Sequence, residues 1–189
     1  MRRINISVKL GFLIPLAFSV LVIPLKWIAA WYFASIVHEL GHLICIWFYG
    51  IPVRSISVNG FGVRIETEPI PYPSNVYCAL SGPVAGLSSL LLLRVCPRVA
   101  LCALLQSCWN LLPLFPMDGG QVTRSILQKL IPQYAERAEN IITQVCITLI
   151  SIGIFYFTVR FSLGFVPVLV WGIFLLRNKK EKLLANGRH

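Results

Sequence analysis

Six long apolar runs divide the chain and restrict what it can fold into. They cover residues 11–25, 27–49, 76–95, 99–114, 141–159 and 161–176, and a run of about 20 apolar residues is long enough to cross a bilayer as a helix. Of the 189 residues, 57% are apolar and 13% are charged, which is too apolar for a soluble domain of this length. The sequence therefore predicts an α-helical integral membrane protein, a single domain over 1–189 with about six transmembrane helices in a lipid bilayer.

The basic residues predict the orientation of these spans. With the N-terminus inside, only Lys26, Arg94, Arg98 and Arg160 of the 17 Lys and Arg residues fall on the outer side. By the positive-inside rule, both termini of this multi-pass membrane protein are expected in the cytoplasm. The net charge of +10 is then explained by anionic lipid headgroups near the tail 177–189, and nucleic acid is not expected as a partner. The first run follows a basic N-terminus but shows no cleavage site, so we expect a retained helix.

The second apolar run contains His38, Glu39 and His42. Residues four apart lie one turn above each other on a helix, so the two imidazoles can bind one metal ion. Glu39 lies beside this face, where it can reach a metal-activated water without ligating the metal. This His-Glu-x-x-His spacing is typical of zinc hydrolases, in which the metal lowers the pKa of water and the Glu takes its proton.

The alternative is that His38 and His42 are buried histidines with ordinary polar partners. Ionisable groups deep in a membrane-length segment are costly, however, and usually mark a functional site. The position of the pair in the apolar run 27–49 therefore favours metal binding.

After this run, the spacing of apolar residues changes to alternation with polar ones. Residues 53–58 and 61–66 alternate apolar and polar side chains around Asn59 and Gly60, which predicts a small β-hairpin between the second and third helices. From the residues alone, the hairpin is either a connector or an edge strand that pairs with an extended peptide.

Two further stretches carry small or polar residues at membrane depth. Residues 81–86, Ser-Gly-Pro-Val-Ala-Gly, permit either close helix packing or a local break that lines a cavity. Asn110 is followed by a Pro- and Gly-rich segment that ends in Asp118, Gly119 and Gly120.

A catalytic zinc takes three protein ligands, and the two histidines supply only two. Asp118 is the acid best placed to be the third, because Glu66 and Glu68 lie in the region of the predicted hairpin and Glu136 and Glu139 in a polar connector. The alternative is that it caps a short interfacial helix expected over 121–131. Asn110 either donates to a substrate carbonyl or joins two helices.

In this order and in apolar spans, residues 38–42 and 110–120 resemble the site-2 protease family of intramembrane zinc metalloproteases. The likeness covers about 27–131 and is strongest to the branch typified by the sporulation stage IV FB protease. It implies one zinc ion on His38, His42 and Asp118, with Glu39 as general base and Asn110 in substrate binding. The hairpin is similar to the family's substrate-aligning element, and residues 81–86 are similar to its Gly-Pro loop, although many members have Asn where Gly86 stands.

The resemblance implies regulated intramembrane proteolysis of a transmembrane or membrane-associated protein, with a possible inhibitory membrane partner. With it we expect the chain in a bacterial plasma membrane. The CBS or PDZ domains of many members find no counterpart in these 189 residues. Two other classes of function stay open on the residues. A metal-ion transporter would be expected to show more polar residues along a path and inverted repeats, and a catalytically silent scaffold would not need Glu39.

Overall fold

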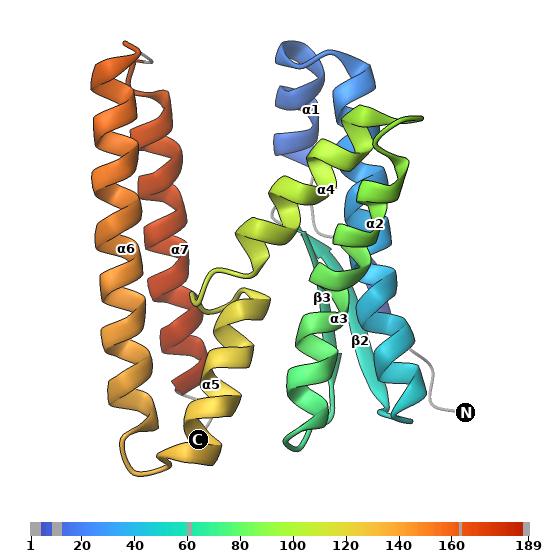
Figure 1. Cartoon of the computed structure of the whole chain (residues 1–189), viewed down its shortest axis with the longest axis vertical. Coiled ribbons are helices and arrows are strands. Elements are labelled where there is room, and N and C mark those ends of the chain that lie inside the picture. The colour runs from blue at the N-terminus through green and yellow to red at the C-terminus, as the bar shows by residue number, and fades with distance from the viewer. Residues whose placement is uncertain (1–4, 9–12, 60–61, 163, 187–189) are drawn as a thin grey trace. The chain divides into compact units, whose positions relative to one another are not determined.

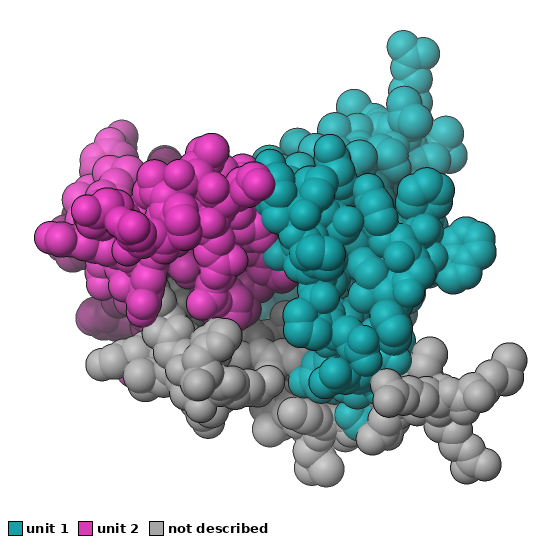
Figure 2. Space-filling model, turned by 90° about the horizontal axis from the view of Figure 1, so that it is seen from below, with its two compact units in different colours: residues 1–111 teal, residues 112–189 magenta. Residues whose placement is uncertain are grey.

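The computed structural model describes residues 5–8, 13–59, 62–162 and 164–186. The chain divides into two compact units, residues 1–111 and 112–189, which Figure 2 shows in teal and magenta. Each unit is described by itself.

The described residues of the first unit form four α-helices, α1 (Leu13–Val22), α2 (Leu25–Phe48), α3 (Ser74–Ser88) and α4 (Pro97–Asn110). A 3-10 turn, η2 (Ser89–Leu92), extends α3. Helix α2 ends in a Schellman motif, in which Gly50 has a φ of +63° and the N–H groups of Gly50 and Ile51 donate to Trp47 O and Ile46 O, both at 3.0 Å. Glycine at this position has no steric penalty in the left-handed region, so the sequence ends the helix here.

Small residues allow α2, α3 and α4 to pack closely on one another (Figure 1). A Cβ on Gly41 would lie 2.5 Å from Ser81 O and 2.6 Å from Ala85 Cβ, so α3 crosses α2 at this glycine. Ala34 and Ala103 belong to the buried cluster between α2 and α4. Helix α3 continues through Pro83, so of the two alternatives for residues 81–86 the structure excludes the local break and supports close helix packing.

The first unit also holds a three-stranded sheet in the order β1 (Asn5–Val8), β2 (Val53–Asn59), β3 (Gly62–Thr67). Strands β2 and β3 are antiparallel and confirm the hairpin. The register pairs Asn59 with Gly62, so Asn59 belongs to β2 rather than to the connection between the strands, and Gly60 lies outside the described residues. Strand β1, which the sequence pattern did not predict, pairs in parallel with β2.

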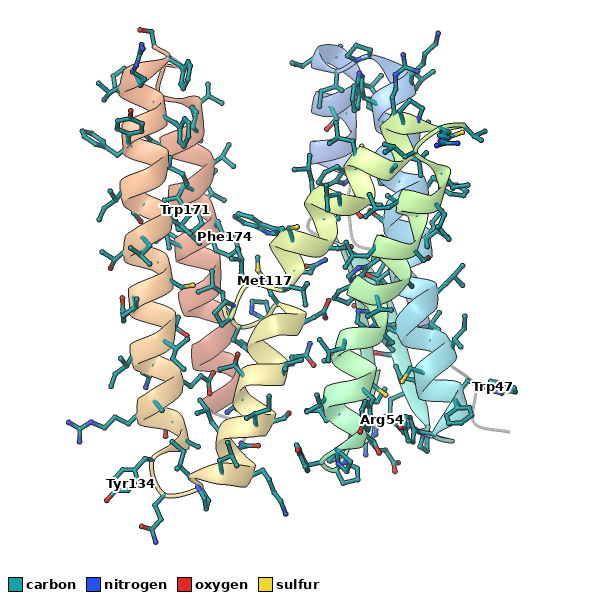
Figure 3. The ribbon with its side chains drawn as sticks, in the orientation of Figure 1. Trp47, Arg54, Met117, Tyr134, Trp171 and Phe174 are labelled. Carbon is teal, nitrogen blue, oxygen red and sulfur yellow. The ribbon has the colours of Figure 1, made fainter. Side chains whose placement is uncertain are left out.

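In the second unit, the described residues form α5 (Asp118–Leu130), α6 (Ala135–Arg160) and α7 (Val166–Asn186). Arg124 and Glu139 form an ion pair at 3.6 Å between α5 and α6. Trp171, which stacks on Phe174 in α7, donates from Nε1 to Ser151 Oγ of α6 at 2.8 Å (Figure 3). Such polar contacts help apolar helices to associate where lipid tails compete with side chains for packing.

Three helices of the described chain are long and apolar enough to cross a membrane, at Leu25–Phe48, Ser74–Leu92 and Ala135–Arg160. On α6, the exposed residues Ile141, Val145, Leu149 and Ile152 follow one helix face, as expected for contact with lipid. The six predicted spans are thus supported in part. Helices α1 and α4 have 10 and 14 residues, and the apolar part of α7 is Val166–Leu176.

Candidate metal centre

The two imidazoles of the His-Glu-x-x-His motif converge on one side of α2. His38 is buried and His42 is half-buried, and their Nε2 atoms lie 3.2 Å apart. The rings meet edge to face, with centroids 4.9 Å apart. The helical spacing therefore brings two potential ligand atoms to one point, as the sequence predicts.

The other nitrogen of His42 has a backbone partner on α3. His42 Nδ1 lies 2.7 Å from Cys78 O, which also accepts from Ser81 Oγ at 2.8 Å. A carbonyl oxygen can only accept, so Nδ1 carries the proton and Nε2 of the neutral ring presents a lone pair. A histidine that binds a metal through one ring nitrogen usually donates the N–H of the other nitrogen in this way.

His38 also presents a lone pair from Nε2. Asn110 Nδ2 on α4 lies 3.3 Å from this atom, and an amide nitrogen can only donate. Two lone pairs 3.2 Å apart cannot form a hydrogen bond with each other, whereas a cation between them would bind both. Tetrahedral zinc with Zn–N distances of about 2.0–2.1 Å holds two nitrogens about 3.4 Å apart, so the observed separation fits a shared zinc ion.

Two glycines of α3 make room for these rings. A Cβ on Gly82 would collide with the Nε2, Cε1 and Cδ2 atoms of His42. A Cβ on Gly86 would collide with Ser107 Oγ and would lie 3.7 Å from His38 Nδ1. The small residues of segment 81–86 therefore admit the candidate ligands as well as the neighbouring helix.

Two further predicted site residues, Glu39 and Asn110, lie on α2 and at the end of α4. Glu39 is half-buried on α2 beside His38. Asn110, expected in substrate binding, is the last residue of α4 and its amide contacts His38, which agrees with its alternative role in joining two helices.

Asp118 belongs to the second unit, where it is buried and is the first residue of α5. Met117, rather than Asp118, is at the N-cap position, so the capping alternative does not explain this acid. A Cβ on Gly120 would lie 2.5–2.6 Å from backbone atoms of Leu114 and Phe115. Gly120 thus lets the preceding turn pack on the first turn of α5, where the helix dipole favours the Asp118 carboxylate. Coordination by Asp118 remains a prediction.

Sequence reasoning missed the contacts that orient the histidines. The carbonyl of Cys78 lies 36 positions from His42, and a backbone acceptor leaves no trace in the residue type. Gly82 and Gly86 indicated close packing, but the sequence did not show that the groups packed against them are the His42 ring and Ser107.

About half of the chain is similar in sequence to two proteins named as zinc metalloproteases. No family model matches the chain. It is 29% identical to a zinc metalloprotease of Methanocaldococcus jannaschii, over 51% of this chain and 33% of that protein. It is 33% identical to a protein of Synechocystis sp. provisionally named a zinc metalloprotease, over 52% of this chain and 30% of that protein. The matches thus span about a third of each relative's length.

A solved structure matches nearly the whole chain. The site-2 protease from Methanocaldococcus jannaschii superposes with a TM-score of 0.64 and 19% sequence identity, over 96% of this chain and 93% of that one. The chain therefore has the fold of a site-2 protease.

Proposed function

We propose that the chain is a site-2 type zinc metalloprotease that hydrolyses a peptide bond of a transmembrane or membrane-associated protein. The observation that carries the proposal is the convergence of His38 Nε2 and His42 Nε2, 3.2 Å apart on a helix of membrane length. The fold and the names of the two relatives support it.

The proposed ligands are His38, His42 and Asp118. They offer two imidazole nitrogens and one carboxylate oxygen, a set that could hold a metal ion. Two histidines and one carboxylate bound to a single zinc leave the fourth position for water or substrate. When bound, zinc acts as a Lewis acid that activates water and polarises the peptide carbonyl.

Glu39 is the proposed general base. Its carboxylate takes a proton from the attacking water and then delivers it to the leaving amine. Asn110 is proposed to donate from its amide to the substrate carbonyl, where negative charge develops during attack. The contact of this amide with His38 Nε2 at 3.3 Å supports the proposal.

The substrate is proposed to bind in an extended conformation along β3. Strand β3 is at one edge of the described sheet, since β1 pairs with the opposite side of β2. A strand edge offers free N–H and C=O groups to a peptide. A helical substrate has to unwind first, because its carbonyls are already hydrogen-bonded within the helix.

The finer expectations from the sequence belong to the same proposal. They are one zinc ion, six spans with both termini in the cytoplasm of a bacterial cell, and membership of the stage IV FB branch. Regulated intramembrane proteolysis and control by a membrane inhibitor also stay proposals.

The replacement Glu39→Gln tests the activity. It keeps the size and polarity of the side chain but removes the base, so we expect zinc binding near wild type and cleavage lowered by about 10²–10⁴-fold. Membrane-protein fragments are compared by mass spectrometry between cells that carry wild type and variant, and zinc is measured on the purified proteins. Glu136→Gln, at an exposed position of α6, is the matched control. Equal fragments from wild type and Glu39→Gln would exclude Glu39 as the base.

A further inference from the structure

A buried hydroxyl on α4 has no role in the proposed mechanism. Ser107 is 0% exposed, and its Oγ makes no hydrogen bond to any group that the structure describes. A buried hydroxyl without a partner is destabilising, because it loses its hydrogen bonds to water on folding, so its presence calls for a physical reason.

Other helical serines of this chain satisfy their hydroxyl locally. Ser35, Ser125 and Ser151 each donate to the carbonyl four residues earlier, at 3.0, 2.9 and 2.7 Å. This back-bond is the usual solution for a serine inside a helix. Ser107 does not make it, so its hydroxyl is directed elsewhere.

The surroundings of Gly86 show what lies near this hydroxyl. Ser107 Oγ and His38 Nδ1 both lie within 4 Å of the point where a Cβ on Gly86 would stand. The three residues come from α4, α2 and α3, which pack on one another in the first unit. The missing side chain of Gly86 therefore lets the Ser107 hydroxyl approach the Nδ1 side of His38.

His42 shows how a hydrogen bond at Nδ1 orients one imidazole of this pair. His42 Nδ1 donates to Cys78 O at 2.7 Å, which directs Nε2 to the proposed metal. We propose that Ser107 is the corresponding positioning residue for His38, and that its Oγ accepts the Nδ1–H of the ring in the metal-bound protein. The inference rests on the proposed function, because it assumes that His38 binds zinc through Nε2.

Zinc affinity is the first test, since loss of an outer hydrogen bond to a metal-binding histidine usually weakens metal binding about 10–100-fold. Full-length Ser107→Ala is purified in detergent and titrated with zinc against a chromophoric chelator. We expect affinity lowered by that factor, with thermal unfolding of the metal-free protein unchanged or slightly improved. Ser88→Ala is the matched control, because it removes the hydroxyl of an exposed serine of α3, which donates to Ala85 O at 2.7 Å. Wild-type affinity in Ser107→Ala would overturn the inference.

A pair of variants separates hydrogen bonding from packing. Alanine at position 86 collides with Ser107 Oγ, but Ser107 Cβ and His38 Nδ1 both lie 3.7 Å from the added carbon. Gly86→Ala combined with Ser107→Ala should therefore fold as stably as wild type and still bind zinc as weakly as Ser107→Ala. Recovery of wild-type affinity in the double variant would show that Ser107 only fills space.

Nitrogen NMR of the imidazoles gives a readout that packing alone would not change. The chain has three histidines, so His189→Gln leaves only His38 and His42 to assign. In the zinc-bound wild type both rings should show a protonated Nδ1, and Ser107→Ala should shift the Nδ1 signal of His38 alone. If the wild type binds no zinc, the proposed function fails; if it binds zinc and Ser107→Ala is identical in affinity and spectrum, only this inference fails.

Discussion

Gly82 is the position where one added carbon should disturb the candidate metal centre most directly. A Cβ on Gly82 would overlap the ring of His42 at Nε2, the proposed metal-binding atom. We expect Gly82→Ala to turn or displace this ring and to lower zinc affinity at least about tenfold, because the proposed ligand atom itself moves. Equilibrium zinc titration of the purified variant measures the change.

Gly153→Ala is the control for this substitution. It adds the same methyl group to membrane-length α6, where nothing lies within 4 Å of the added carbon. Zinc affinity should stay at the wild-type value there. Unchanged affinity in both variants would mean that His42 Nε2 is not a ligand.

Residue spacing was enough to predict the histidine pair but not its surroundings. His38 and His42 converge because four residues make about one helical turn, a property of local geometry. Their contacts with Asn110 and Cys78 depend on how α3 and α4 cross α2, and that crossing is set by tertiary packing. The sequence favoured a substrate role for Asn110 through the family resemblance, whereas its observed contact is with His38.

At the level of elements, Gln106 joins α4 to α2. This buried side chain donates from Nε2 to Trp31 O and to Ser35 Oγ, both at 3.0 Å. Polar contacts between membrane helices contribute about 0.6 kcal/mol on average and up to about 1.7 kcal/mol. We therefore expect Gln106→Leu to lower the free energy of unfolding by about 1–2 kcal/mol, measured by denaturant titration in detergent.

Gln144→Leu tests whether the position or the amide matters. Gln144 is exposed on α6, so the same replacement there should leave the unfolding midpoint unchanged or raised. If Gln106→Leu unfolds at the wild-type midpoint, the two hydrogen bonds do not hold α4 against α2.

Some elements were predictable from local pattern and others were not. The hairpin was predicted because Asn59 and Gly60 lie between two alternating runs, although Asn59 is paired with Gly62 as the last residue of β2. Strand β1 has only four residues, too few for a pattern, and it forms by pairing with β2 far along the chain. Pro83 suggested a break in α3, but tertiary packing overrides the local effect of a proline within a tight helix bundle.

At the scale of the whole molecule, the number of spans decides where the termini lie. The three helices that meet the length and hydropathy criteria would by themselves place the two ends on opposite sides of a membrane. Six spans place both ends on the same side, as the distribution of Lys and Arg predicts. The question is therefore whether α1, α4 and the apolar part of α7 cross the bilayer.

Reporter fusions decide between these two topologies. A fluorescent protein that matures only in the cytoplasm is fused to either end of the full chain, and alkaline phosphatase, active only outside, replaces it in a parallel set. Because Lys and Arg near the spans hold a segment on the cytoplasmic side, we expect fluorescence and no phosphatase activity from both ends. As a control, phosphatase inserted in the expected outer loop beside Arg94 and Arg98 should be active. Opposite signals from the two termini would leave an odd number of spans and would contradict the six-span topology.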